Sequence, residues 1–95
     1  MATPRVQRRR DAVSHVVARM GTDMFTTHEV WFTGQRLLAT ESWPRFLKAA
    51  FKSLSNPDTV GAVLARHPDF GRIDGGNHNE RLSMGGVRTA LWERR

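Results

Sequence analysis

The sequence predicts a mainly helical α+β domain, in which three to four helices precede a small two-stranded β-hairpin. Three observations lead to this fold class. Apolar residues recur at helical spacing through most of the chain. Capping and turn signals separate these stretches from one another. Two short segments near the end, residues 70–73 and 87–93, have the composition of antiparallel strands.

The composition is that of one globular domain. The chain has 95 residues, 39% hydrophobic and 25% charged, so we expect a single domain over residues 5–95 after a disordered tail at residues 1–4. No apolar stretch is long enough to cross a membrane, and no apolar segment of a secretory signal follows the basic N-terminus. Cysteine is absent, which excludes a disulfide scaffold. We expect a cytoplasmic protein, associated with a nucleoid or acting in a host cytoplasm.

The charge balance indicates a polyanionic partner. The net charge is +6, and Lys48 and Lys52 are the only lysines among the 15 basic residues. Arginine forms paired hydrogen bonds to phosphates and to guanine edges. The bias towards arginine is also typical of a GC-rich genome, whereas the net positive excess favours nucleic acid. A solubility role and a ribosome-like RNA binder are the alternatives.

The first helix is expected over residues 5–20. Gly21 is a natural stop, since glycine accepts the left-handed conformation at a helix end. Five apolar residues fall on one face of this helix, namely Val6, Val13, Val16, Val17 and Met20. Its first turn carries arginines that the helix dipole disfavours, which hints at a phosphate partner.

A capping box predicts the start of the second helix. Thr26 and Glu29 have the spacing at which each side chain caps the other residue's backbone amide. The helix should then run from Thr27 to about Thr33 and bury Val30, with Gly34 ending or kinking it. A very short strand at residues 24–25 is expected just before the cap.

The third helix is predicted over residues 43–54, with Ser42 as its N-cap and Pro44 in the first turn. Its expected buried face comprises Phe46, Leu47, Ala50, Phe51 and Leu54. Its cations, Arg45, Lys48 and Lys52, form one stripe on the other side.

The fourth helix should follow Asn56-Pro57, with Asp58 as its cap and residues 59–66 as its body. Val60, Val63 and Leu64 would face inward. Its exposed face is poor in groups that can read bases. The segment at residues 74–86, between the two strands, is long and glycine-rich, so we expect a mobile loop.

This order of helices and strands, from about Arg5 to Glu93, resembles the winged helix-turn-helix superfamily. The resemblance rests on residues 25–31, 59–66, 70–73 and 87–92, and it implies a non-enzymatic protein that binds double-stranded DNA. In compact members only a few residues separate the second and third helices, whereas this chain has the basic segment 43–54 at that point. Either residues 59–66 are the recognition helix or residues 43–54 enter the groove; we expect the two to form the helix-turn-helix pair and to share the contact.

The expected DNA-binding residues come from every part of this arrangement. The basic stripe of the third helix would hold phosphates, the fourth helix would approach the major groove, and arginines of the wing and of a basic N-terminal arm would clamp the backbone. These residues are Arg45, Lys48, Lys52, Thr59, Ala62, Arg66, Arg72, Arg81, Arg88, Arg8 and Arg9.

The most natural role for such a protein is a small prokaryotic or phage transcriptional regulator, with a homodimer as an option. One alternative is a winged-helix module that binds an acidic protein surface, and another is an excisionase-like architectural factor. No cofactor and no metal are expected, because the four histidines lack metal-ligand spacing. The tripeptide His67-Pro68-Asp69 also occurs in J-domain co-chaperones, but here it precedes a strand, and we treat the match as chance.

Overall fold

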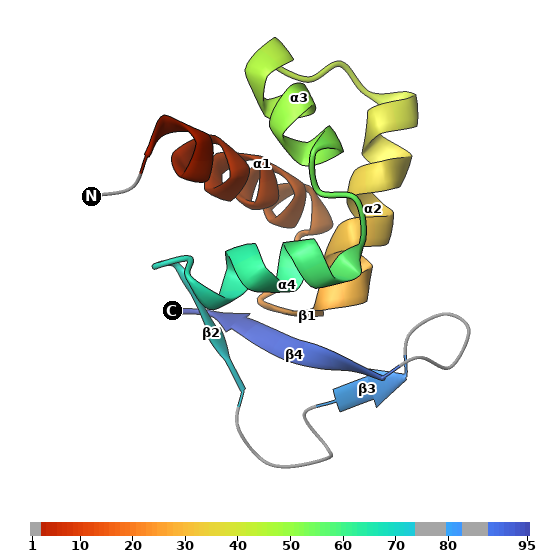
Figure 1. Ribbon diagram of the computed structural model, residues 1–95. Helices are drawn as coiled ribbons and strands as arrows, with labels where there is room; N and C mark the ends of the chain where they lie inside the picture. Colours follow the sequence, from red (N-terminus) through yellow and green to blue (C-terminus); the bar gives the residue numbers. More distant parts are fainter. Residues whose placement is uncertain (1–2, 74–79, 83–87) are drawn as a thin grey trace.

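The computed structural model describes residues 3–73, 80–82 and 88–95, which form four helices and four short strands. The elements follow the chain in the order α1 (Pro4–Met20), β1 (Met24–Thr26), α2 (Thr27–Thr40), α3 (Arg45–Lys52), α4 (Pro57–Ala65), β2 (Phe70–Arg72), β3 (Glu80–Leu82) and β4 (Arg88–Arg94). The predicted α+β class is confirmed, since a mainly helical body carries a small antiparallel sheet (Figure 1).

Strand β4 is the centre of the sheet. It pairs antiparallel with β1 along one edge, where Phe25 lies opposite Trp92, and with β2 along the other edge, where Gly71 lies opposite Glu93. The amide of Ile73 also donates to the carbonyl of Leu91, which extends the β2–β4 pairing by one residue. The last strand therefore joins β1, which lies between α1 and α2 in the sequence, to β2, which follows α4.

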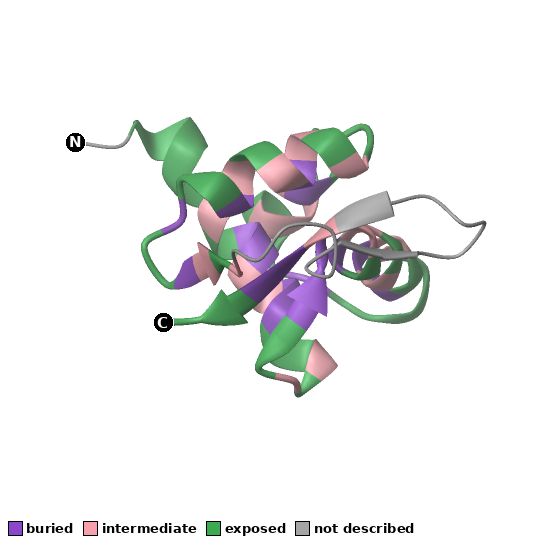
Figure 2. Cartoon of the chain, turned by 90° about the horizontal axis from the view of Figure 1, so that it is seen from below, coloured by how far each residue is buried: buried purple, intermediate pink, exposed green. Residues whose placement is uncertain are grey.

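The helices form a layer above this sheet. Helices α2 and α4 pack on the strands, α1 packs on both of them, and α3 lies on α1 at the end of the molecule remote from the sheet (Figure 1). Buried positions gather where the helices and the sheet meet, while exposed positions occupy the outer surfaces (Figure 2). The edge-to-face pair of Phe25 and Phe70, with ring centroids 5.4 Å apart, joins the two outer strands beneath the helices.

Helix α1 agrees with its prediction except at its first turn. It begins at Pro4, ends at Gly21 in the left-handed conformation, and buries Val13, Val16 and Val17 completely. Val6 does not join them and remains 39% exposed. It lies in the first turn, at the edge of the body, where fewer side chains can cover it.

Helix α2 is longer than predicted. The Thr26–Glu29 capping box is present as expected and Val30 is buried, but the helix continues through Gly34 to Thr40. Gly34 neither ends nor kinks it. The glycine is buried because the ring of Phe51 occupies the space that a side chain would fill, so this residue serves packing between helices.

Helix α3 is shorter than the predicted 43–54, and it also differs in its cap and in the burial of Phe46. Its N-cap is Pro44 and no side chain caps it, so the assignment of Ser42 was wrong. Phe51 and Leu54 are buried as expected, but Phe46 is 54% exposed. Phe51 packs against Gly34 of α2 and against Trp43, whereas Phe46, five residues earlier, is turned by about 140° from it around the helix axis.

Helix α4 is capped by Asn56 rather than by Asp58. The side chain of Asn56 accepts from the amide of Thr59, the Thr59 side chain reaches back to the Asn56 amide, and Pro57 occupies the first turn. Val60 and Leu64 are buried, whereas Val63 is only half-buried.

The segment expected to be a mobile loop contains strand β3. The backbone of Glu80–Leu82 pairs antiparallel with β4, Arg81 lying opposite Thr89. A strand was not expected there because glycine and asparagine dominate the composition of the segment. The remaining residues of the predicted loop, 74–79 and 83–86, lie outside the described residues.

Candidate nucleic-acid interface

The middle of the exposed side of α4 is built from alanine, with a charged side chain near each end. Val60 and Leu64 face the core, which leaves Asp58, Ala62, Ala65 and Arg66 exposed on the opposite side. Side chains of this size allow a helix backbone to approach another surface closely. The face offers few groups that could distinguish one base from another.

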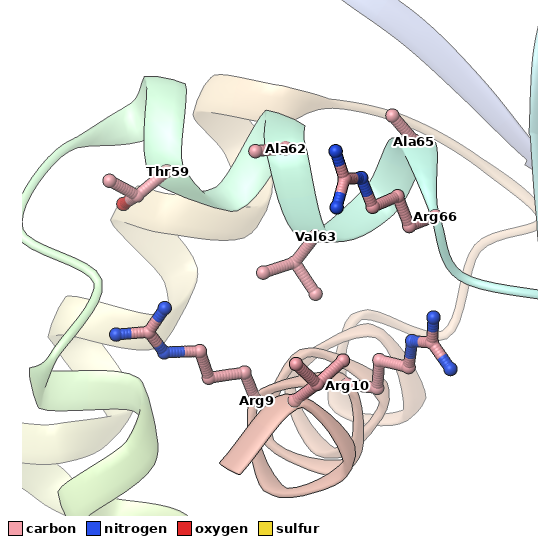
Figure 3. A pocket seen from close by; sticks show the side chains of 8 residues that line it. Arg9, Arg10, Thr59, Ala62, Val63, Ala65 and Arg66 are labelled. Atoms are coloured by element: carbon pink, nitrogen blue, oxygen red, sulfur yellow. The ribbon is translucent and has the colours of Figure 1, made fainter. Parts of the chain in front are cut away.

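A basic groove runs along one flank of this face, between α4 and the N-terminal half of α1. It has a volume of about 450 Å³ and its apolar floor includes Val6, Ala62 and Val63. Val63 points into the groove towards α1, while the guanidinium of Arg66 extends along the α4 side (Figure 3). Arg9 and Arg10 extend to opposite sides from the α1 backbone (Figure 3). Three arginines thus rim a groove with an apolar floor.

A smaller groove lies on the other flank of α4, next to the sheet. Its volume is about 280 Å³, and its lining includes Asp58 of α4, His28 of α2 and Arg72 of β2. Trp92 closes its base, where the indole Nε1–H donates to the hydroxyl of Thr27 over 2.8 Å. Arginine side chains therefore stand on both flanks of the small-residue face.

The basic stripe of α3 is separate from this surface. Arg45 and Lys52 are exposed and Lys48 is half-buried, but none of the three lines either groove beside α4. Helix α3 packs mainly on α1, and α4 packs mainly on α2. The expected pairing of residues 43–54 with residues 58–66 is therefore wrong, because α3 packs on α1 whereas α4 packs on α2 and α1.

The other predicted site residues fall into two groups. Thr59, Ala62, Arg66 and Arg9 line the α1–α4 groove together, and Arg72 lines the groove on the sheet side. Arg8 lies in α1 but faces α3. Arg81 and Arg88 lie in β3 and β4, where the structure describes the backbone pairing alone. The N-terminal arginines belong to an ordered helix rather than to an arm.

Sequence reasoning left Arg10 out of the predicted set. Its side chain is half-buried at the α1–α4 groove, and its Nε atom has no hydrogen-bond partner among the described residues. The run of three arginines at residues 8–10 is the feature of the sequence that could have indicated Arg10. Helical geometry directs Arg8 towards α3 and Arg10 towards α4, but this depends on which helices flank α1.

His67 is buried, at 6% exposure. Its Nδ1 accepts a hydrogen bond from the backbone amide of Asp69 over 3.1 Å, so the neutral ring carries its proton on Nε2. That Nε2–H donates to the hydroxyl of Ser14, 2.7 Å away. Burial lowers the pKa of His67 and outweighs the carboxylate of Asp69, whose oxygen lies 4.0 Å from Nδ1.

Ser14, His67 and Asp69 have the residue types of a catalytic triad but not its hydrogen-bond directions. In a triad the serine hydroxyl donates to histidine and the other ring nitrogen donates to the carboxylate. Here the histidine donates to serine, and its Nδ1 is occupied as an acceptor. This geometry ties the end of α4 to α1 and does not activate Ser14 as a nucleophile.

The three tryptophans anchor the core. Trp92 and Trp43 are buried, and the half-buried Trp31 donates its Nε1–H to the carbonyl of Leu54. Trp43 packs against Phe51 and against His15, whose ring centroid lies 4.6 Å away. Burial lowers the pKa of His15, with a further contribution from the positive charge of Arg19.

Within the described part of the chain, no cluster of three or more histidine, aspartate or glutamate side chains could hold a metal ion. No helix there is long and apolar enough to traverse a lipid bilayer. Comparison of the chain with models of protein families, with curated proteins and with solved structures finds no match. The function proposed below therefore rests on the geometry of the chain itself.

Proposed function

We propose that this chain is a winged-helix protein that binds double-stranded DNA, with α4 as the helix that enters the major groove. The order of the elements supports this assignment. Strand β1 lies between α1 and α2 in the sequence, β2 and β4 follow α4, and β4 lies between β1 and β2 in the sheet. Helix α3 is then an insertion between the two helices of the helix-turn-helix pair, α2 and α4.

One observation carries the proposal: a helix face of small side chains lies between two arginine-bearing flanks. Arg9 and Arg10 stand on the α1 side, Arg72 stands on the sheet side, and Arg66 lies at the end of α4 itself. Phosphate contacts on both sides of a helix position it in a groove without reading sequence. The scarcity of base-reading groups on α4 indicates that positioning dominates over direct readout.

The proposal predicts binding that is strongly salt-dependent. If all four arginines contact phosphates, the logarithm of the association constant should fall with the logarithm of salt concentration with a slope of about −4. Titration of the protein into a random-sequence duplex at several salt concentrations measures this slope. Undetectable binding at low salt would overturn the proposal.

Two charge-reversed variants locate the interface. Arg9→Glu/Arg66→Glu should abolish binding at moderate salt, whereas Arg45→Glu/Lys48→Glu changes the net charge equally on a helix that lines neither groove beside α4. The second variant should weaken binding much less. A greater loss in the α3 variant would instead assign the contact to residues 45–52.

A further inference from the structure

A third groove lies on another side of α1, between its N-terminal half and α3. Its volume is about 550 Å³. One wall carries Arg5, Arg8 and Arg9 of α1, and the other carries Phe46, Ala49 and Ala50 of α3. Because α1 and α3 pack extensively on one another, their firm contact fixes the two walls of the groove. The groove exists because α3 is inserted between α2 and α4.

Phe46 gives this groove its apolar character. At 54% exposure, it is the most exposed large hydrophobic side chain in the part of the chain that the structure describes. It belongs to a helix whose other phenylalanine, Phe51, is completely buried. Contact with another apolar side chain would remove the ring from water, which is favourable in proportion to the area covered.

The positive charge of the groove indicates which kind of occupant fits it. It is lined by three arginines and by no acidic residue. Arg9 is held in place, since its Nε–H donates to the hydroxyl of Ser53 over 3.2 Å and that hydroxyl donates to the carbonyl of Ala50 over 2.6 Å. A second copy of the chain would bring the same three cations to a symmetric contact. An acidic occupant would complement them.

We propose that the α1–α3 groove docks an acidic segment of a partner protein, which places a large apolar side chain against Phe46 and carboxylates on Arg5, Arg8 and Arg9. A protein segment fits this lining better than nucleic acid does. The α3 wall presents Ala49 and Ala50 beside a single aromatic ring, whereas sites for single-stranded nucleic acid stack successive bases on several aromatic rings. The site shares Arg9 with the proposed DNA interface, but Phe46 and Arg8 line the α1–α3 groove and neither groove beside α4, so substitutions at these two residues test it separately.

The experiment selects peptides from a displayed random library against the full chain and measures the binding of the enriched peptides by fluorescence anisotropy at fixed salt. The enriched peptides should combine aspartate or glutamate with leucine or phenylalanine. Their affinity should fall by about tenfold or more for Phe46→Ser and for Arg8→Glu, as expected for anchor residues. Failure to enrich any acidic peptide would overturn the proposal.

Two matched controls accompany these variants. Phe32→Ser removes an exposed phenylalanine of α2, and Lys52→Glu reverses a cation of α3; neither residue lines the groove. Both should bind the peptides nearly as well as the unmodified chain does. Equal loss in the Lys52→Glu variant would mean that the peptides respond to net charge alone, which contradicts a specific groove.

Duplex DNA provides the test that separates this site from the proposed function. Phe46→Ser should leave DNA affinity unchanged, because Phe46 does not line the grooves beside α4. A parallel loss of DNA and peptide binding would assign Phe46 to the nucleic-acid surface and overturn the docking proposal. If the chain does not bind DNA but Phe46→Ser selectively loses peptide binding, the docking proposal is supported and the DNA-binding proposal is overturned. Circular dichroism verifies that each variant is folded.

Discussion

The ring of Phe51 in α3 lies directly over the backbone of Gly34 in α2, in the position that a side chain of residue 34 would occupy. We predict that Gly34→Ala destabilises the protein, although alanine is the better helix former. Overpacking at a closed interface costs about 1–3 kcal/mol, which exceeds the gain of about 1 kcal/mol in helix propensity. Chemical denaturation measures the difference in the free energy of unfolding.

Gly61→Ala is the matched control for this substitution. Gly61 also lies within a helix, but a methyl group there would meet only the side chain of Thr27, at ordinary contact distances of 3.4 Å to Cγ2 and 3.9 Å to Oγ1. Alanine should leave the stability unchanged or raise it by up to about 1 kcal/mol. Equal destabilisation by both substitutions would contradict the role assigned to the Phe51 ring.

Helix capping supplies a second test. Asn56→Ala removes the side chain that accepts from the Thr59 amide, and it should lower the free energy of unfolding by about 1 kcal/mol. Ser42→Ala should change it by less than about 0.5 kcal/mol, because Ser42 does not cap α3. Thermal and urea denaturation of the two variants compare a cap present in the structure with one that the sequence alone indicated. Similar losses would contradict the α3 boundary.

The buried His67 predicts a loss of stability in mild acid. Its pKa is lowered by burial in the folded protein, whereas the unfolded chain takes up the proton near the ordinary value of 6.5. Between the lowered pKa and 6.5, the unfolded state binds more protons. Stability should therefore be constant above about pH 7 and fall as the pH drops through this window. Denaturation with urea at a series of pH values measures the effect.

Substitution of the histidines assigns this pH dependence. His67→Gln should be less stable at neutral pH, since the links to Ser14 and to the Asp69 amide change, but its stability should fall less between neutral and mildly acidic pH. His15, whose pKa is also lowered, should account for part of the remaining slope. An unchanged slope in the double variant His15→Gln/His67→Gln would exclude both histidines as its source.

The small-residue face of α4 can be tested by adding one side chain. Ala62 is exposed, so Ala62→Glu should leave the melting temperature nearly unchanged. If α4 enters the DNA groove, the added carboxylate should weaken binding by about tenfold or more through steric and like-charge effects. Ala39→Glu makes the same change at an exposed position of α2 and should have a much smaller effect. Equal losses would indicate a response to net charge.

Local signals in the sequence were sufficient for several elements. The Thr26–Glu29 capping box, the stop at Gly21 and the buried spacing of Val13, Val16 and Val17 each depend on residues within a few positions, and these predictions are confirmed, although Val6 does not join the buried face. Predictions that involved packing were less successful. Gly34 was expected to interrupt α2, because its partner Phe51 is distant in sequence and gives no local signal.

The candidate site illustrates the same division. Sequence alone indicated a basic chain with arginines in α1, α4 and β2, because charge and helical periodicity are properties of composition and short-range order. It did not indicate that Arg10 joins Thr59, Ala62 and Arg66 in one groove while the cations of α3 lie elsewhere.

The sequence by itself thus determined where most helices form and the net charge that they carry, since capping, periodicity and side-chain ionisation act over a few residues. Only the tertiary structure decided that α4 pairs with α2, that α3 lies across α1, and that β4 joins β1 to β2. These choices depend on the burial of apolar faces from distant segments, such as Phe25 and Phe70 beneath the helices. The free energy of burial depends on the apolar area that is covered and not on the order of the residues in the sequence. The sequence alone therefore allows more than one way of packing the same faces.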